Sequence, residues 1–268
     1  MTVSRHLYPI MEHDGSSESI IKADRHGKDR FPGLCLMTYF GEVLTSFTEQ
    51  NRCRVIHAYH SEMRDFPVYE LRYRGVDLCL VQGLVGSPAA AMIAEFLFAY
   101  GVTNLLTCGG CGVLQDIPPG EVIVPVAALR DEGTSYHYLP PEREISITRS
   151  MVAAIMETLR RRNVPYMECK TWTTDGFYRE TPAMVEYRRQ EGCQVVDMEC
   201  AALAAVAQFR GKAFGQVLYS GDILTDVHNY DERGWQENVT AREKLFALSL
   251  EILHHIGSGE KGRGCANG

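Results

Sequence analysis

One segment joins an apolar, β-branched run to an alanine-rich run through two carboxylates. Residues 195–203 read VVDMECAAL, so Asp197 and Glu199 flank a single methionine. The first run has the composition of a buried strand, and the second has the pattern of a helix. The chain is therefore constrained to a fold in which a strand leads directly into a helix. Two carboxylates at such a junction are costly to bury unless they meet hydroxyls, cations or backbone amides, so we treat the junction as a candidate site.

Two further residues lie at similar distances from this junction. Phe177 precedes Glu199 by 22 residues, and Asp222 follows Glu199 by 23 residues at the end of another apolar run. An aromatic ring, a Met–Glu pair and a second carboxylate together suit a ribose that carries a base. Each residue alone also has a structural interpretation: Glu199 as a charge near a helix N-terminus, Asp222 as a turn former and Phe177 as core.

Segments with strand and helix patterns alternate along most of the chain. Strands are expected at residues 34–40, 68–73, 76–82, 104–108, 122–126, 168–174, 194–196 and 212–220, and helices at 88–100, 151–162, 182–190, 199–210 and 238–255. This alternation predicts an α/β fold, a single-domain three-layer sandwich around a central mixed, largely parallel sheet. We expect residues 1–30 to form an N-terminal arm, residues 31–256 the folded domain and residues 257–268 a disordered, Gly-rich tail.

Composition and charge exclude several classes of protein. The formal net charge is -7 and no segment concentrates positive charge, which argues against binding to nucleic acid. No run of about 18 apolar residues fits a membrane span and no N-terminal stretch fits a signal peptide, so we expect a cytoplasmic protein with no membrane partner. The nine cysteines are scattered and odd in number, which indicates reduced thiols. Cys108 and Cys111 form a Cys-x-x-Cys, but no second pair completes a zinc site, so we predict no metal and no cofactor.

With these spacings the chain resembles the nucleoside phosphorylase and nucleosidase superfamily, and both spacings are similar to those of its purine-type members. The resemblance implies an enzyme that cleaves the N-glycosidic bond of a nucleoside through a transition state like an oxocarbenium ion. Glu199 would bind the 2′- and 3′-hydroxyls, Met198 would pack under the sugar and Asp197 would assist. Asp222 would protonate a purine as it leaves, so Glu199 and Asp222 are the expected catalytic residues.

The resemblance also implies where the base lies. The segment TCGGCG at residues 107–112 follows an expected strand and is predicted to be a Gly-rich loop. Its backbone amides could approach an anion or a planar ring closely. In the family this loop lines the phosphate and base sites, and the aromatic residue would stack on the base. The residues assigned to the base are Phe177, Val196, Cys111 and Gly112.

The sequence does not define as clearly whether phosphate or water accepts the sugar. Family phosphorylases bind phosphate largely through arginines, and Arg64 aligns with one that reaches into the neighbouring subunit's site. Two other arginines of the family pattern are missing here: residues 38–43 read TYFGEV, and the position before the Gly-rich segment is not arginine. Glu42 instead resembles the Glu of the family's hydrolytic nucleosidases, which orients the attacking water. The residues assigned to the phosphate or water site are Arg64, Thr107, Gly110 and Glu42.

We therefore predict phosphorolysis of a nucleoside to the free base and (deoxy)ribose 1-phosphate, with inorganic phosphate as co-substrate. A purine is slightly favoured over uridine because of Asp222, although residues 130–140 resemble a segment of uridine phosphorylases. Two alternatives stay open: a hydrolytic nucleosidase that uses water activated by Glu42, and a non-catalytic nucleoside-binding protein. The family places Arg64 and the N-terminal arm across a subunit interface, so we expect a homodimer or a hexamer.

Overall fold

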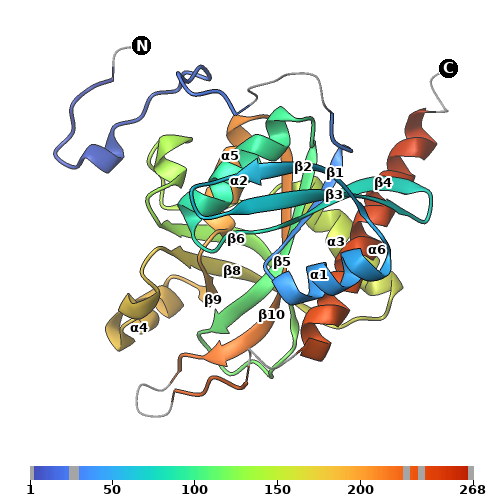
Figure 1. The fold of residues 1–268 in the computed structure, drawn as a ribbon. Helices are drawn as coiled ribbons and strands as arrows, with labels where there is room; N and C mark the ends of the chain where they lie inside the picture. Colours follow the sequence, from blue (N-terminus) through green and yellow to red (C-terminus); the bar gives the residue numbers. More distant parts are fainter. Residues whose placement is uncertain (1–2, 24–29, 226–229, 235–238, 265–268) are drawn as a thin grey trace.

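The computed structural model describes residues 3–23, 30–225, 230–234 and 239–264, in which strands and helices alternate (Figure 1). The strands are β1 (Leu34–Thr38), β2 (Arg54–His60), β3 (Asp65–Tyr73), β4 (Val76–Gln82), β5 (Asn104–Val113), β6 (Val122–Asp131), β7 (Glu144–Ser146), β8 (Tyr166–Thr174), β9 (Cys193–Asp197) and β10 (Ala213–Ile223). The α-helices are α1 (Gly41–Gln50), α2 (Ser87–Ala99), α3 (Arg149–Arg161), α4 (Pro182–Gln190), α5 (Cys200–Phe209) and α6 (Val239–Gly264). Short 3-10 helices are η1 (Pro9–Met11), η2 (Ser135–His137) and η3 (Phe177–Arg179).

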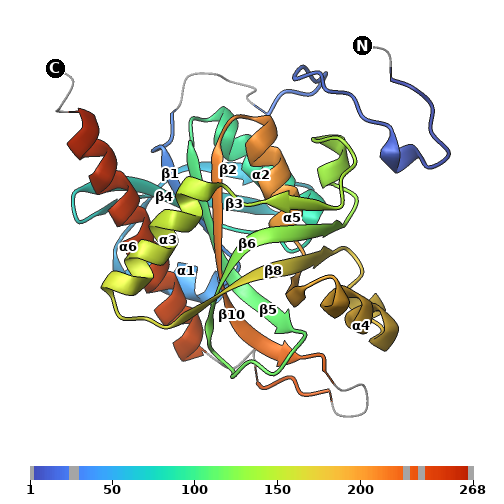
Figure 2. The same cartoon turned by 180° about the vertical axis from the view of Figure 1, so that it is seen from behind.

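The strands form one sheet of ten, which lies between two layers of helices. Helices α2 and α5 cover one face, and α1, α3 and α6 cover the other (Figures 1 and 2). The predicted three-layer α/β sandwich is therefore confirmed. The sheet exists because each helix has an apolar face that must be buried against another element.

Parallel strands occupy the centre of the sheet. Strands β4, β1, β5 and β10 run side by side in one direction, and β6, β8 and β9 form a second parallel group. Antiparallel pairs join the two groups, because β10 also pairs with β6 and β5 also pairs with β9. A ring of five strands is therefore closed, formed by β5, β10, β6, β8 and β9. The carboxyl ends of β1, β5 and β10 meet at one edge of the sheet, which is where side chains from distant parts of the sequence can gather.

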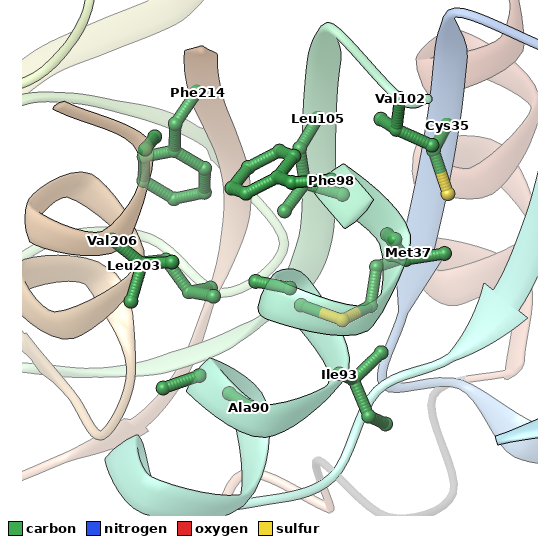
Figure 3. Packing of buried hydrophobic residues seen from close by; sticks show 14 of the residues in the cluster. Cys35, Met37, Ala90, Ile93, Phe98, Val102, Leu105, Leu203, Val206 and Phe214 are labelled. Carbon is green, nitrogen blue, oxygen red and sulfur yellow. The ribbon is translucent and has the colours of Figure 1, made fainter. Parts of the chain in front are cut away.

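Two buried apolar clusters hold the helices on the sheet. Figure 3 shows part of the first, in which Ile93 and Phe98 of α2 pack with Leu203 and Val206 of α5 and with Phe214 of β10. The second lies between the opposite face and helices α1, α3 and α6. Complete burial of one Leu, Ile or Phe side chain contributes about 1.5–3 kcal/mol, so these clusters determine where each helix lies.

Two predicted elements have the bounds that the sequence indicated. Strand β4 and helix α4 cover residues 76–82 and 182–190 as expected, and the other predicted elements differ at their ends. The sequence did not predict α1, β2 or β7. Helix α1 has a sequence, GEVLTSFTEQ, with weak helix propensity, and it is held by packing of Val43 and Leu44. Strand β2 is a largely exposed edge strand without a clear alternation of polar and apolar residues.

The prediction of a Gly-rich loop at residues 107–112 was wrong, because β5 continues through this segment to Val113. The glycines make room for aromatic rings. A Cβ atom on Gly109 would lie 3.0 Å from Cδ2 of Tyr39, and one on Gly110 would lie 3.2 Å from Cζ of Tyr219. Such contacts are tighter than ordinary van der Waals separations.

The prediction of a disordered tail from residue 257 was also wrong for residues 257–264, which continue helix α6. Residues 265–268 lie outside the described part of the chain. Gly257 is buried, and a Cβ atom there would lie 2.5 Å from Cγ1 of Val76 and 2.8 Å from Cδ1 of Leu34. The glycine therefore allows the helix to approach the sheet closely. None of the described helices has the length and apolar character needed to cross a membrane.

Candidate active site

A cavity of about 220 Å³ opens at the carboxyl ends of β1, β5, β9 and β10. It is lined by Tyr39, Phe40, Val85, Gly110, Cys111, Gly112, Phe177, Glu180, Val196, Asp197, Met198, Glu199, Gln216, Leu218, Tyr219, Gly221, Asp222 and Arg242. All the residues that the sequence assigned to the ribose and base sites lie in this lining. Of the residues assigned to phosphate or water, only Gly110 does; Arg64, Glu42 and Thr107 do not line the cavity.

Asp197 ends β9 and has all its acceptor positions filled. Its Oδ1 accepts hydrogen bonds from the hydroxyls of Thr171 and Thr173 at 2.9 and 2.8 Å. Its Oδ2 accepts bonds from the backbone N–H groups of Glu199 and Cys200 at 3.0 and 2.6 Å. A carboxylate offers about four lone-pair positions, so none remains for a ribose hydroxyl. The expected ribose-binding role of Asp197 is therefore replaced by a positioning role: it fixes the turn that carries Glu199.

Glu199 lies at the N-terminus of α5 and is almost completely buried. Its Oε1 accepts a hydrogen bond from the backbone N–H of Gly86 at 2.6 Å, and Oγ of Ser87 donates to the carbonyl of Met198 at 2.7 Å. Gly86 has a φ of 96°, which a residue with a side chain rarely adopts. Burial, and then the charge of Asp197, raises the pKa of Glu199 to about 8. The turn before α2 therefore holds this carboxyl in place.

Other residues of the cavity lining form a space that suits a planar ring. Phe177 is 45% exposed on η3, so its ring is available to a ligand. A Cβ atom on Gly112 would lie 2.5 Å from Cδ1 of Leu224 and 2.9 Å from Cγ1 of Val196, so only glycine fits between these side chains. Cys111 donates its thiol hydrogen to the carbonyl of Tyr219 at 3.4 Å. These residues form an apolar slot whose edges are backbone atoms.

Asp222 lies at this slot. It is the penultimate residue of β10, whereas the sequence predicted a strand that ends before it. The hydroxyl of Tyr230 donates to its Oδ2 at 3.0 Å, and its Oδ1 faces Gly112. Burial raises the pKa of Asp222 above its usual range, and the bond from Tyr230 opposes this effect. Glu180, which the sequence analysis missed, lines the same cavity; burial and then the charge of Asp222 raise its pKa to about 8.

Three polar side chains at this edge of the sheet have buried polar atoms without a hydrogen-bond partner among the described residues: Tyr39, Thr107 and Gln216. Thr107 and Gln216 are opposite each other in the parallel ladder of β5 and β10. Burial, and then the charges of Glu199 and Asp197, raise the pKa of Tyr39. An unsatisfied buried polar group costs about 1–3 kcal/mol, so such a cluster is typical of a site that binds a ligand. Gln216 could have been suspected from the sequence as an amide within an apolar strand.

Arg242 supplies a cation that the sequence analysis did not find. It lies in the first turn of α6, where Nη1 is 2.5 Å from Oε1 of Glu42 and Nε–H donates to the hydroxyl of Tyr219 at 3.5 Å. Its guanidinium carbon is 5.7 Å from the centre of the Phe40 ring. Arg64, by contrast, is exposed and donates to Oε1 of Gln82 at 2.6 Å. Nothing in the sequence pattern links residue 242 to residue 42.

The segment at residues 130–140, which resembles a segment of uridine phosphorylases, begins at the end of β6, contains η2 and is held by contacts within itself. The buried guanidinium of Arg130 donates to Oγ of Ser135 and to the carbonyls of Leu139 and Pro140. Among the described residues, no group of three His, Cys, Asp or Glu side chains could hold a metal ion. The eight cysteines in this part of the chain, Cys108 and Cys111 included, are free thiols.

Comparison with known proteins adds four findings. A family model described as the phosphorylase superfamily matches residues 34–254. The chain is 28% identical to a guanosine phosphorylase of Halorubrum lacusprofundi over 162 residues, which is 59% of this chain and 66% of that protein. It is 28% identical to a DeoD-type purine nucleoside phosphorylase of Myxococcus xanthus over 68% of this chain and 76% of that protein. The crystal structure of an AMP nucleosidase from Bacteroides thetaiotaomicron superposes with a TM-score of 0.70 and 25% identity, over 86% of this chain and 91% of that one.

Proposed function

The chain belongs to the phosphorylase superfamily, and on this premise we propose that it cleaves the N-glycosidic bond of a purine nucleoside by phosphorolysis. The products are the free base and (deoxy)ribose 1-phosphate. The observation that carries the proposal is that Glu199 and Asp222, on different elements, line one cavity together with an aromatic ring and a guanidinium. Inorganic phosphate is the co-substrate, and no cofactor is invoked.

Glu199 binds the sugar in this proposal. Oε1 is held by the N–H of Gly86, so the second carboxylate oxygen can accept hydrogen bonds from the 2′- and 3′-hydroxyls. Met198 packs beneath the ring. As the glycosidic bond lengthens, positive charge develops on the ribose, and a buried carboxylate beside it stabilises that charge more strongly than water would. Asp197 contributes by fixing the backbone of Glu199.

Asp222 activates the leaving base. Its Oδ2 is occupied by Tyr230, and its Oδ1 faces the slot between Gly112 and Phe177 in which a purine would lie. Protonation of a purine nitrogen lets the C1′–N9 electron pair leave with the base without forming an unstable anion. The guanosine and purine nucleoside phosphorylases among the relatives support a purine substrate.

Arg242 is the group that makes phosphate a reasonable acceptor. A guanidinium provides paired donors that match phosphate oxygens, and Arg242 lines the cavity while two arginines of the family pattern are missing. Backbone amides near Gly110, the hydroxyl of Thr107 and Arg64 from a neighbouring subunit would complete the site. Glu42 competes with phosphate for the guanidinium of Arg242, so the affinity for phosphate should be weak.

Hydrolysis is the second candidate, and Tyr39 is the observation that favours it. Its ring fills the space between β4 and β5: Cβ atoms on Gly83 and Gly109 would lie 2.8 and 3.0 Å from it. A neutral hydroxyl without a partner suits a water molecule better than a dianion. The structural likeness to an AMP nucleosidase supports this candidate as well. Glu42 would then act as the base, which requires it to leave Arg242.

A panel of nucleosides, separated by chromatography after incubation with phosphate, tests the proposal. We expect release of free base from guanosine, inosine or adenosine in preference to uridine. Asp222→Asn should reduce purine release by roughly 10²-fold or more, within the range of general acid catalysis, and affect uridine much less. A nucleoside that raises the melting temperature without any base release would contradict the proposal and favour a non-catalytic binding protein.

A further inference from the structure

Glu180 is a carboxyl of the cavity for which the proposed mechanism has no use. It directly follows η3, the short helix that carries Phe177, and it lines the cavity beside the base slot. The side chain is only partly exposed, and no described residue forms a hydrogen bond or an ion pair with it. A carboxyl in this situation needs either a proton or a ligand.

Asp222, on the same cavity, has a different environment. Tyr230 donates a hydrogen bond to its Oδ2 at 3.0 Å, and such a bond stabilises an ionised carboxyl. The other charged or titratable groups that act on Asp222 are Glu232 and Arg233, in the segment after β10, which have opposite charges. On β5 it faces Cys111, whose thiol is buried and neutral at physiological pH. The two carboxyls of the cavity are therefore unequal.

We propose that Glu180 is a second acid of the leaving-group site, which holds the single proton of the Glu180–Asp222 pair at neutral pH and supplies it through Asp222 to the departing purine. The inference rests on the proposed function. It adds a residue that the family resemblance did not assign. Two carboxyls that face one desolvated space cannot both ionise without a large electrostatic cost. Because only Asp222 receives a hydrogen bond that favours its ionised form, the single proton resides on Glu180 when no base is bound.

The proton balance of the step is as follows. When the purine binds, the single proton of the pair passes from Glu180 to Oδ1 of Asp222. The C1′–N9 electron pair then leaves with the purine as N7 takes this proton, and the carboxyl pair regains one proton from solvent after the base departs. The attacking HPO₄²⁻ forms the new C1′–O bond and loses its own proton on becoming the ester dianion. Release of that proton to solvent balances the uptake by which the carboxyl pair returns to its singly protonated state. The raised pKa of Glu180, about 8, keeps the pair singly protonated near neutrality.

Glu180→Gln tests the proposal, because glutamine preserves the size and polarity of the side chain but carries no titratable proton. With a purine nucleoside, kcat/KM should fall by at least about 10-fold. With 4-nitrophenyl β-D-riboside, whose leaving group needs no proton, it should change less than about 2-fold. Relative to activity with the riboside, wild-type activity with the purine should fall as pH rises through about 8, and that of the variant should fall at lower pH, because Asp222 no longer has Glu180 as its source of a proton. This ratio cancels the titration of Glu199, whose raised pKa is also about 8. In Glu180→Asp, which keeps a titratable carboxyl, the loss of purine activity at high pH should return part of the way toward that of the wild type.

Glu49→Gln is the matched control, since Glu49 is an exposed glutamate near the end of α1 that does not line the cavity. Its pH profile should match that of the wild type. An unchanged pH profile in Glu180→Gln, or an equal loss with both substrates, would overturn the inference. So would a change confined to the preference between 6-amino and 6-oxo purines. Wild-type protein that releases no base from any nucleoside would contradict the proposed function itself, whereas normal wild-type turnover with a normal Glu180→Gln variant would remove only this inference.

Discussion

Nη1 of Arg242 lies 2.5 Å from Oε1 of Glu42, so the first turn of α6 is tied to the first turn of α1 beside the cavity. This contact joins the two residues on which the choice of acceptor depends. A guanidinium attracts phosphate, and a carboxylate repels phosphate but can activate water. The predictions below follow from this balance and from the buried groups around it.

Arg242→Gln should weaken the binding of phosphate more than it slows the chemical step. We expect the KM for phosphate to rise by about 10-fold or more, since a charge-assisted contact contributes about 1.5–3 kcal/mol. The KM for the nucleoside should change little. Initial rates at varied phosphate measure this, with Arg149→Gln, an exposed arginine of α3, as the control. An unchanged phosphate KM would remove Arg242 from the acceptor site.

Glu199→Gln should lower kcat/KM for the nucleoside by roughly 10²-fold or more, which corresponds to about 3 kcal/mol of lost transition-state stabilisation. The fold should survive, because glutamine can still accept the hydrogen bond from Gly86. Steady-state kinetics and a thermal melt check both parts. Near-native turnover in this variant would remove the main basis for the ribose site.

Thr107→Val should stabilise the protein while it impairs function. The hydroxyl of Thr107 is buried without a partner, and removing such a group recovers about 1–3 kcal/mol, or a rise in melting temperature of about 2–8 °C. The KM for phosphate should rise. Thr158→Val is the control, because the buried hydroxyl of Thr158 donates to the carbonyl of Ala154 at 2.8 Å and its loss should not stabilise. A lower melting temperature for Thr107→Val would show that its hydroxyl has a structural partner.

Arg64 should act across a subunit interface, since within its own chain it is exposed, donates to Gln82 and does not line the cavity. We expect a homodimer or a hexamer in light scattering, and a raised phosphate KM in Arg64→Ala without a change in oligomeric state. A stable, fully active monomer would contradict both the interface and the role of Arg64.

The sequence predicted those parts of the fold that depend on local pattern. Strand β4 has the expected bounds because its apolar run lies between Gly75 and Gly83, and helix α4 because it begins at Pro182 and Gly192 follows it. The Gly-rich segment of β5 was mistaken for a loop, because glycine is common in both loops and close contacts. Only the structure shows that Gly109 and Gly110 accommodate the rings of Tyr39 and Tyr219.

The residues of the candidate site also fall into those that the sequence could predict and those that it could not. Glu199 and Asp222 could be found because each follows an apolar run of the sequence at a spacing typical of the family. Arg242 and Glu180 could not, because they lie on elements whose local patterns carry no signal of chemistry. Their positions follow from how α6 and η3 meet the ends of the central strands. Long-range convergence of this kind depends on packing rather than on sequence periodicity.

The sugar product, followed with phosphate rigorously removed and then restored, tests phosphorolysis most directly. The proposal predicts ribose 1-phosphate formed only when phosphate is present. Glu42→Gln should then leave the activity largely intact or increase it, because the competitor for Arg242 loses its charge. Free ribose formed at an unchanged rate without phosphate, and abolished by Glu42→Gln, would contradict the account and make the protein a nucleosidase.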